Sequence, residues 1–320
     1  MPSIAEKAIE EAFRALVIRI TENSGNTLTD YQVKIVLNET NFTDWDKVLS
    51  DGSDIFFLDE NGNPLYFWIE EFDKTAKKAT IWVKVPSIPA NGETTIYMCY
   101  GGMENPFSSY HDPENVFDFF DDFEGTELDT TKWNTHLYSG GSIVVSDGYV
   151  KLISAIIVSK TYQITDGIIE TKGIMKRQEM SLFGRASVNS GDAFESCYGL
   201  HTGSFSDTSW NFVIVVDNTD KLVYDPTPTP TDTEVLLRFI MNGNELTGQR
   251  FNYNTGEQIG STISTTHTKY SQGYIGLRVD GIGDREAWYD WIRVRKYVDP
   301  EPSISIVESK FLAKHRIDLY

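Results

Sequence analysis

The chain has 320 residues, of which 40% are hydrophobic and 13% are aromatic. This apolar content is enough for packed cores and excludes a generally disordered chain, while the length favours two domains. The formal net charge of −19 at pH 7 repels phosphate backbones and anionic lipid, so we expect no nucleic-acid partner and no membrane insertion. An acidic surface suits cations and neutral ligands such as glycans, and it is equally typical of a solvated surface without a specific role.

Two cysteines, Cys99 and Cys197, are too few for a disulfide framework or a zinc cluster. Their apolar and aromatic neighbours favour two separate buried thiols, with one disulfide between them as the alternative. We recognise no signal peptide and no apolar stretch long enough to span a bilayer. A trimmed sequence would explain this, and so would a protein that reaches a surface by assembly, as virion proteins do.

Residues 1–14 are predicted to form a short amphipathic helix. Ser3 is a suitable N-cap, and the apolar residues that follow it recur on one helical face. We expect this helix to pack on the chain's own sheet, and docking on a neighbouring subunit is the alternative.

Residues 15–112 are predicted to form a first β-sandwich domain. Short apolar or alternating stretches recur there, separated by turns rich in Gly, Asn and Pro, a spacing that is typical of sandwiches. The expected strands are residues 16–21, 31–37, 55–59, 65–70, 79–85 and 94–100.

Residues 113–302 are predicted to form a second all-β domain, because no credible long helix interrupts a further series of apolar stretches. The expected strands are residues 119–125, 149–153, 167–173, 180–186, 212–216, 235–240, 246–253, 273–279 and 287–295. Residues 226–232 alternate Pro and Thr and predict a stiff exposed loop. Pro300-Glu-Pro302 ends this domain, and we expect residues 303–320 to form a C-terminal tail, a strand followed by a short helix-like end.

Ordered motifs in the first domain resemble a known family. They are Ile18-Arg-Ile-Thr-Glu-Asn-Ser-Gly, Gly52-Ser-Asp-Ile-Phe-Phe-Leu-Asp, Tyr66-Phe-Trp-Ile-Glu, Ile81-Trp-Val-Lys-Val-Pro and Tyr97-Met-Cys-Tyr-Gly. Together they resemble a domain of unknown function that is common in archaeal and bacterial surface proteins. The resemblance implies a surface location and a concanavalin A-like sandwich after this domain, and it implies no activity for the domain itself.

Two distant motifs in the second domain carry another resemblance. They are Asp121-Asp-Phe-Glu-Gly-Thr-Glu-Leu-Asp-Thr-Thr-Lys-Trp133 and Tyr289-Asp-Trp-Ile-Arg-Val. They resemble the opening and closing strands of the concanavalin A-like superfamily of lectins, laminin-G-type modules and glucanases. This implies that the two strands pair side by side, with Trp133 and Trp291 as core residues. We therefore predict two β-sandwich domains in tandem, the second a concanavalin A-like jelly roll, with a short N-terminal helix.

Glucanases of this superfamily carry an alternating Glu-x-Asp-x-Glu strand, which places catalytic carboxylates on one face. The present sequence has no such triplet. Glu170 and Glu179 are the nearest candidates, and solvated strand-face charges explain them equally well. The five histidines are scattered and lack metal-ligand spacing. We expect a protein that is not an enzyme, with a divergent glycoside hydrolase as the second alternative.

The resemblance to sandwich glucanases implies a structural Ca²⁺ ion that ties the opening strand to the closing strand. Asp290 matches the closing-strand aspartate, Gly148 the nearby glycine and Asp122 the opening-strand position. Carboxylates and carbonyl oxygens are the ligands that Ca²⁺ prefers. The alternative is that Asp290 caps a strand or accepts hydrogen bonds from backbone amides.

The stretch His201-Thr-Gly-Ser-Phe-Ser-Asp-Thr-Ser-Trp-Asn211 is loop-like and rich in aromatic and polar residues. Sugars stack their apolar faces on aromatic rings while polar side chains bind their hydroxyls, so this composition favours a glycan site. The predicted contacts are Arg185, Tyr198, Phe205, Asp207, Trp210 and Asn211. The alternative is that Trp210 simply begins a core strand.

These observations predict a non-catalytic glycan-binding or adhesion protein at an extracellular or virion surface, with a glycan or polysaccharide as its partner. A homo-oligomer, or contacts with other virion or surface proteins, would supply further partners. The first alternative is a structural assembly protein, such as a virion decoration, tail or filament subunit. A viral protein for host recognition would combine both functions.

Overall fold

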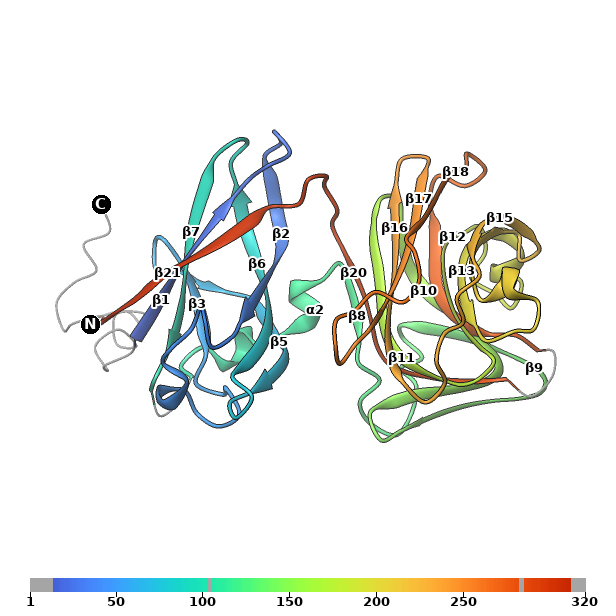
Figure 1. The fold of residues 1–320 in the computed structure, drawn as a ribbon, viewed down its shortest axis with the longest axis horizontal. Helices are drawn as coiled ribbons and strands as arrows, with labels where there is room; N and C mark the ends of the chain where they lie inside the picture. The colour runs from blue at the N-terminus through green and yellow to red at the C-terminus, as the bar shows by residue number, and fades with distance from the viewer. Residues whose placement is uncertain (1–13, 103–104, 282–284, 312–320) are drawn as a thin grey trace. The chain divides into compact units, whose positions relative to one another are not determined.

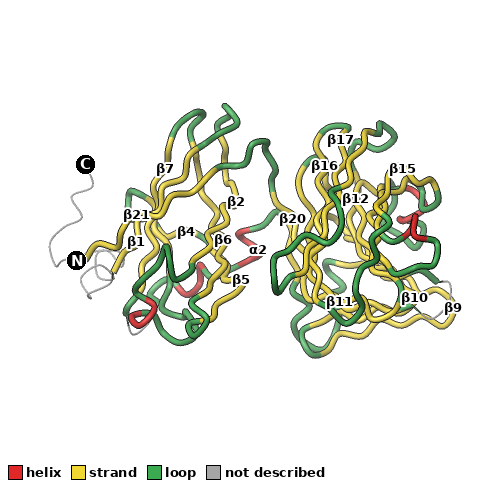
Figure 2. The backbone as a smooth tube through the Cα atoms, in the orientation of Figure 1, coloured by secondary structure: helices red, strands yellow, loops and turns green. Residues whose placement is uncertain are grey.

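The computed structural model describes residues 14–102, 105–281 and 285–311. Strands dominate these residues, and helix is confined to α2 (Pro113–Val116) and to single turns (Figure 2). The all-β prediction is therefore confirmed. The predicted helix over residues 1–14 lies outside the described residues, apart from Arg14, which begins the first strand. The chain divides into two compact units, one of residues 1–118 and 298–320 and the other of residues 119–297.

Two sheets make up the first unit, in the strand orders β21-β1-β7-β3-β4 and β2-β6-β5. The strands are β1 (Arg14–Thr21), β2 (Leu28–Leu37), β3 (Phe56–Asp59), β4 (Pro64–Leu65), β5 (Phe67–Asp73), β6 (Lys78–Ile88), β7 (Glu93–Tyr100) and β21 (Ser303–Phe311). One core of buried side chains receives residues from both sheets, among them Ile18, Ile35 and Ile81. Each predicted strand of this region is present, and the stretch predicted at residues 65–70 is divided between β4 and β5.

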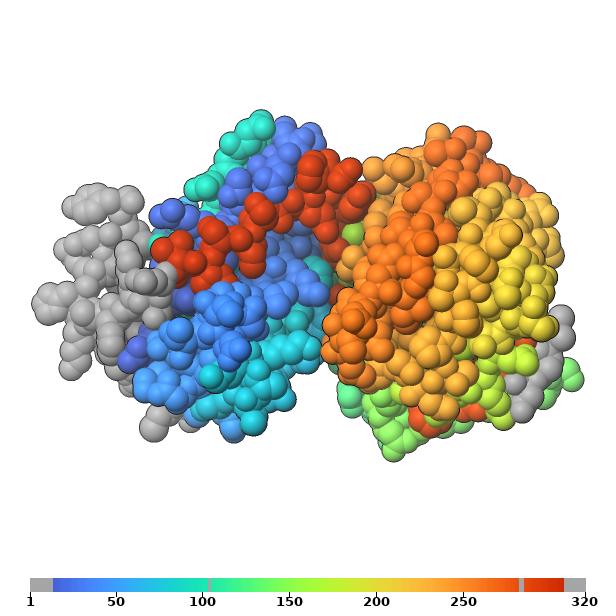
Figure 3. All heavy atoms as spheres, viewed as in Figure 1, coloured from blue at the N-terminus to red at the C-terminus, as the bar shows by residue number. Residues whose placement is uncertain are grey.

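The strand β21 differs from its predicted role as a separate C-terminal tail. It runs antiparallel to β1, with Ile18 opposite Ile306, and lies beside it in Figure 1. The side chains of Ile304 and Ile306 pack against the core of the first unit, and this stretch covers part of its surface in Figure 3. Because β7 occupies the other edge of β1, β21 completes the pairing of β1. The second unit is thus an insertion in the first, and the two domains are not simply in tandem.

The strands of the second unit follow one hydrogen-bonded path, β15-β14-β13-β12-β19-β10-β20-β11-β16-β17-β18, with β9 beside β10 and β8 beside β20. They are β8 (Phe119–Asp121), β9 (Trp133–Ser146), β10 (Tyr149–Ile164), β11 (Gly167–Arg177), β12 (Glu179–Ala186), β13 (Tyr198–Gly203), β14 (Phe212–Val216), β15 (Asp220–Asp225), β16 (Glu234–Asn242), β17 (Glu245–Asn252), β18 (Ile263–Thr266), β19 (Gly273–Val279) and β20 (Glu286–Arg295).

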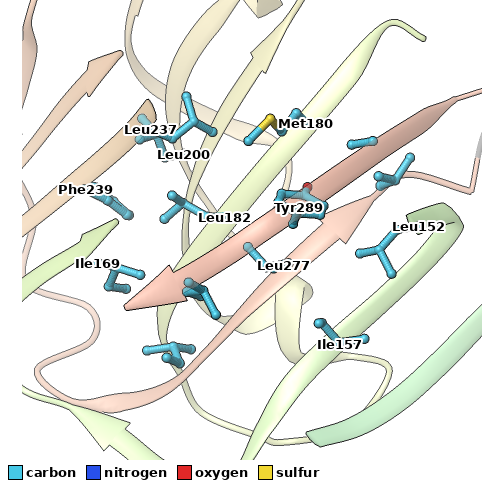
Figure 4. Close-up of a cluster of buried hydrophobic side chains, with 14 of the residues drawn as sticks. Leu152, Ile157, Ile169, Met180, Leu182, Leu200, Leu237, Phe239, Leu277 and Tyr289 are labelled. Atoms are coloured by element: carbon cyan, nitrogen blue, oxygen red, sulfur yellow. The ribbon is translucent and has the colours of Figure 1, made fainter. Parts of the chain in front are cut away.

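The long strand β10 folds this path into two layers. Its first part pairs with β20 and its later part with β19, and Ser154 between them has a left-handed φ of 43°. Side chains of strands far apart on the path meet in one core, as Leu182 and Leu200 do with Leu237 and Phe239 (Figure 4). The second unit is therefore a β-sandwich closed around this core.

The opening strand β8 pairs with the closing strand β20, as the two resemblance motifs predicted. Asp121 lies opposite Ile292, and Phe119 lies opposite Val294. Both predicted tryptophans, Trp133 and Trp291, are buried. Two segments separated by more than half the chain thus meet at one seam.

The pairing of β21 with β1 gives a first prediction. Replacing Ile306 by Ala removes a half-buried side chain from the first unit's core, so we expect a loss of about 1–2 kcal/mol in its free energy of unfolding. The neighbouring Ser305 is exposed, and Ser305→Ala should change stability by less than about 0.5 kcal/mol. Denaturant titration of both variants measures the difference. Equal stabilities would show that β21 does not pack on this unit.

Candidate functional site

The strands β14, β13, β12 and β19 lie side by side and carry a continuous row of residues. Val213 is opposite His201, His201 is opposite Ser181, and Ser181 is opposite Arg278. Residues directly opposite one another in antiparallel strands project from the same face. Leu200, the neighbour of His201, points into the sandwich core, so this row points away from the core, on what we call the outer face.

A network of four charged side chains lies on the outer face. Glu179 binds Arg278 at 3.2 Å through one carboxylate oxygen and Arg285 at 2.7 Å through the other. Asp280 binds the same two arginines at 3.0 and 2.7 Å. Two carboxylates and two guanidinium groups compensate one another, so this network has no net charge.

The Glu179 carboxylate also begins a hydrogen-bonded chain across two strands. Its Oε1 accepts from Ser181 Oγ at 2.9 Å, and Ser181 Oγ lies 2.9 Å from His201 Nδ1. Burial raises the pKa of Glu179, but the contact with His201 Nδ1, 3.4 Å from Oε1, and the charges of Arg278 and Arg285 outweigh it and lower that pKa to about 2. Glu179 is therefore ionised at neutral pH although its side chain is buried.

Aromatic rings stand beside His201 because glycines flank it on the same face. A Cβ atom at Gly199 would come within 2.5 Å of the Phe194 ring, and a Cβ atom at Gly203 would overlap the Phe205 ring. Only glycine leaves room for these rings against the strand. The Phe194 ring meets the His201 ring edge to face at 5.0 Å. The two glycines in Gly199-Leu-His201-Thr-Gly203 thus allow aromatic rings to pack beside the His201 side chain.

A pocket of about 270 Å³ opens beside this network. Its lining residues are Glu179, His201, Phe205, Trp210, Asn218, Thr219, Asp280 and Arg285. Trp210 ends the single turn η4 (Thr208–Trp210), and its ring lies 5.8 Å from that of His201. The Lys221 ammonium lies 4.1 Å from the centre of the Trp210 ring. The pocket thus combines the half-buried rings of Phe205 and Trp210 with polar side chains whose charges neutralise one another.

Two of the six predicted ligand contacts, Phe205 and Trp210, lie together in this pocket. Asp207 lies near it and caps η4, accepting from the Ser209 amide at 3.1 Å. Asn211 is buried, and its side chain accepts from the Phe205 amide at 2.7 Å and donates to the Pro226 carbonyl at 2.9 Å. Asn211 therefore holds the loop that carries the aromatic residues.

The other two predicted contacts, Tyr198 and Arg185, are not among the residues that line the pocket. The Tyr198 ring belongs to the sandwich core, and its hydroxyl accepts from the Tyr270 amide at 2.9 Å. Arg185 is buried and donates to the carbonyls of Thr165 and Gly243, each at 2.8 Å. Both side chains are engaged in contacts that stabilise the sandwich.

Glu179, His201, Asp280 and Arg285 were not predicted as ligand contacts. The sequence predicts Glu179 as a candidate catalytic carboxylate or a solvated strand-face charge, and His201 as the start of the aromatic loop without metal-ligand spacing. The alternation Glu179-Met-Ser181 and the glycines around His201 place these polar residues on one face of each strand. Arg285, in contrast, lies 106 residues beyond Glu179, and no local pattern reveals that contact.

The second candidate carboxylate, Glu170 on β11, belongs to a different ion network from that of Glu179. It is bound by Arg238 at 2.6 Å, by Arg293 at 2.7 Å and by Arg295 at 3.4 Å. Burial raises the pKa of Glu170, but these three guanidinium groups hold it well below its usual range. A general acid needs a carboxyl that stays protonated near neutral pH, which neither Glu170 nor Glu179 does.

The predicted calcium position lies at the seam of β8 and β20. Asp290 is bound by the Lys172 ammonium at 2.7 Å, and Lys172 also binds Glu234 at 2.9 Å. Burial and the charges of Glu234 and Asp122 raise the pKa of Asp290, against the opposite effect of Lys172. Asp122 directly follows β8, so both carboxylates belong to segments of the same seam. Within residues 14–102, 105–281 and 285–311, no three His, Cys, Asp or Glu side chains form a group that could hold a metal ion.

The two cysteines lie in different units and are both free and buried. The predicted separate thiols are therefore present, and the alternative disulfide is not. Burial raises the pKa of Cys99 to about 12 and that of Cys197 well above its usual value. In the part of the chain that the structure describes, no helix has the length and apolar composition required to cross a membrane.

Comparison with known families and structures identifies one domain model, the domain of unknown function DUF2341, which matches residues 51–136. This confirms the predicted resemblance of the first domain to a domain of unknown function over that range. The chain is also 32% identical over 132 residues to uncharacterized protein 562 of Sulfolobus islandicus rod-shaped virus 1. That match covers 35% of the chain but only 22% of the length of the viral protein.

Solved structures with partial similarity include two from Bacillus subtilis. The carbohydrate-binding module CBM66 is 17% identical, covering 53% of the chain and 98% of the module, with a TM-score of 0.40. A protein of unknown function with a galectin-like fold is 15% identical, covering 56% of the chain and 96% of its own length, with a TM-score of 0.44. The exoplasmic/lumenal domain of VIP36, in its Ca²⁺/Man2-bound form, is 12% identical over 58% of the chain and 95% of that domain, with a TM-score of 0.41.

The lowered pKa of Glu179 gives a second prediction. A folded-state pKa of about 2 against an ordinary value of 4.5 stabilises the fold above pH 4.5, and this contribution is lost as the pH falls towards 2. Glu179→Gln leaves the buried Arg278 and the half-buried Arg285 without this counter-charge, so we expect a loss of about 3 kcal/mol at pH 7. The stability difference from the parent protein should shrink between pH 4.5 and 2, as measured by urea unfolding.

Glu245→Gln is the matched control, because Glu245 is exposed on β17. It should change stability by less than about 0.5 kcal/mol at each pH. A Glu179→Gln effect that stays constant between pH 7 and pH 2 would contradict the assigned ionisation.

Proposed function

We propose that the protein is a non-catalytic glycan-binding protein of an extracellular or virion surface, and that its sugar binds in the outer-face pocket. The observation that carries this proposal is the meeting of Phe205 and Trp210 with the polar groups of Glu179, His201 and Arg285 in one pocket. Sugars offer apolar C–H faces to aromatic rings and hydroxyls to polar groups. A volume of about 270 Å³ suits one sugar ring better than a longer segment.

The two candidate carboxylates support a binding function rather than hydrolysis. A glycosidase needs a protonated carboxyl on one side of the scissile bond and a second carboxylate near it. Glu170 and Glu179 both have lowered pKa values, and each is bound by arginines of its own cluster. Neither residue is suited to protonate a leaving group.

The closed sandwich supports the predicted concanavalin A-like character of the second unit, because β8 and β20 pair at a seam where the motifs of that superfamily meet. The viral relative supports a virion surface as the place of action. A structural assembly protein of a virion is the second candidate function, favoured by that relative alone. The two functions are compatible in a protein that decorates a particle and binds a host glycan.

Trp210 provides the direct test. We expect the intact protein to bind at least one class of glycan on an array, and Trp210→Ala to weaken that binding at least about tenfold, because the stacking surface is lost. Trp288→Ala is the matched control, since that ring also has lysines beside it, Lys151 at 4.5 Å and Lys176 at 4.7 Å, but lies outside the pocket. Absence of any glycan binding by the intact protein would contradict the proposal.

The structural Ca²⁺ ion predicted at the seam is a separate proposal. Asp122 and the second oxygen of Asp290, with main-chain carbonyls such as that of Gly148, are its proposed ligands. An ion bound only by the folded state stabilises it, so we expect millimolar Ca²⁺ to raise Tm by about 2–4 °C relative to chelator. Asp290→Asn should abolish this increase.

Glu234→Gln is the control for the calcium experiment, because it also removes a partner of Lys172 without removing a proposed ligand. It should retain the calcium-dependent increase in Tm. A parent protein with the same Tm in Ca²⁺ and in chelator would show that the Lys172 ammonium alone neutralises Asp290.

A further inference from the structure

The hydrogen bonds around Ser181 determine which nitrogen of His201 carries a proton. Glu179 is ionised and can only accept, so the hydroxyl of Ser181 donates to its Oε1. A serine has a single hydroxyl proton, and Ser181 Oγ therefore acts as the acceptor in its 2.9 Å contact with His201 Nδ1. The proton lies on Nδ1. In a neutral imidazole with its proton on Nδ1, Nε2 has a free lone pair and is a hydrogen-bond acceptor.

His201 Nε2 is buried and has no hydrogen-bond partner among the described residues. The residue itself is only 5% exposed, and it lines the pocket. Aromatic rings of Phe194 and Trp210 stand beside it. Buried polar atoms are nearly always paired in folded proteins, so an unpaired acceptor at a pocket wall points to a partner that the pocket receives.

Arg285 presents the complementary group in the same pocket. Its terminal nitrogen NH1 binds Glu179 and Asp280, each at 2.7 Å. Its Nε–H, in contrast, is buried and has no partner within the described part of the chain. The pocket therefore offers one unpaired acceptor and one unpaired donor. A sugar carries hydroxyls that can donate to the first and accept from the second.

The charges around the pocket indicate that this sugar is neutral. The guanidinium groups of Arg278 and Arg285 are both neutralised by the carboxylates of Glu179 and Asp280. The remaining nearby cation, Lys221, lies 3.6 Å from Asp207. The carboxylate of an acidic sugar would therefore find no free positive charge among the described cations of the pocket. The net charge of −19 on the chain would also repel such a sugar.

We infer that the pocket selects an uncharged sugar, one hydroxyl of which donates a hydrogen bond to His201 Nε2 while another oxygen accepts from Arg285 Nε. This inference rests on the proposed glycan-binding function and specifies its ligand class. His201 thereby determines specificity, since it accepts from a hydroxyl and does not bind a charge.

The tautomer can be tested without any ligand. In a long-range ¹H–¹⁵N correlation spectrum at pH 8, His201 should show an unprotonated Nε2 and a protonated Nδ1. The His201→Gln variant identifies the resonance by its disappearance. A protonated Nε2 at this pH would overturn the inference, because that atom would then be a donor.

The ligand class is tested by saturation-transfer NMR with two sets of probes. The neutral set contains methyl glycosides of glucose, galactose, mannose and N-acetylglucosamine, and the acidic set contains methyl glucuronide, methyl galacturonide and sialic acid. We expect saturation transfer only within the neutral set. Transfer to acidic sugars alone would overturn the inference while leaving glycan binding intact. Absence of transfer to both sets, together with an array without hits, would overturn the proposed function itself.

Two variants of His201 separate its hydrogen bond from its shape. His201→Phe keeps an aromatic ring but has no acceptor, and it should weaken binding of the best neutral glycoside at least about tenfold. His201→Gln supplies an amide oxygen and should retain binding within about threefold. Thermal unfolding of both variants verifies that they are folded. Parental affinity in His201→Phe would overturn the acceptor role.

Discussion

The register of β12 between β13 and β19 is the constraint on which the outer face depends. A shift by one residue would turn Glu179 and Ser181 into the sandwich core and bring Met180 and Leu182 to the surface. The apolar residues of β12 therefore fix the positions of its polar ones. Ser181 is opposite both His201 and Arg278, so one register sets the hydrogen-bonded chain and the ion pairs together.

A buried ion network is an expensive way to stabilise a sandwich. Moving charges out of water costs free energy that their mutual attraction only partly offsets, and apolar residues of similar size often stabilise a fold as well or better. Close to Glu179, the same face is already apolar, with Phe183, Phe194 and Val213 in one buried cluster. An extended apolar cluster would therefore be expected to stabilise this face at least as well as the charged network. The clearer effect of that network is to hold His201 and Arg285 in fixed orientations beside a pocket.

Local sequence patterns identified most strands but not their distant neighbours. In the second unit they missed β9, β13, β15 and β18, so His201 lies on a strand and not in the predicted loop. The rest of the aromatic loop contains Phe205 and Trp210, which line one pocket. Predicting the charged network would require knowledge of the contact between Glu179 and Arg285, which lies 106 residues further along the chain. The strand at Ser303–Phe311 was expected, but its pairing with β1 was not. One misplacement was avoidable in principle. Tyr198 and His201 are three residues apart in one strand, so they must face opposite sides of the sheet.

An uncharged pocket on a strongly acidic chain implies that selectivity arises from matched hydrogen bonds rather than from long-range attraction. A ligand without a suitable hydroxyl would displace water from the pocket and still leave His201 Nε2 and Arg285 Nε without hydrogen-bond partners. Polar groups left unpaired on binding discriminate more strongly than an apolar pocket discriminates between ligands of similar shape. In the proposed glycan site, the aromatic rings would supply affinity that many sugars share, while the two polar atoms would distinguish among them. Because Glu179 binds Arg285 and is linked to His201 through Ser181, the buried carboxylate also positions the two atoms that would recognise the ligand.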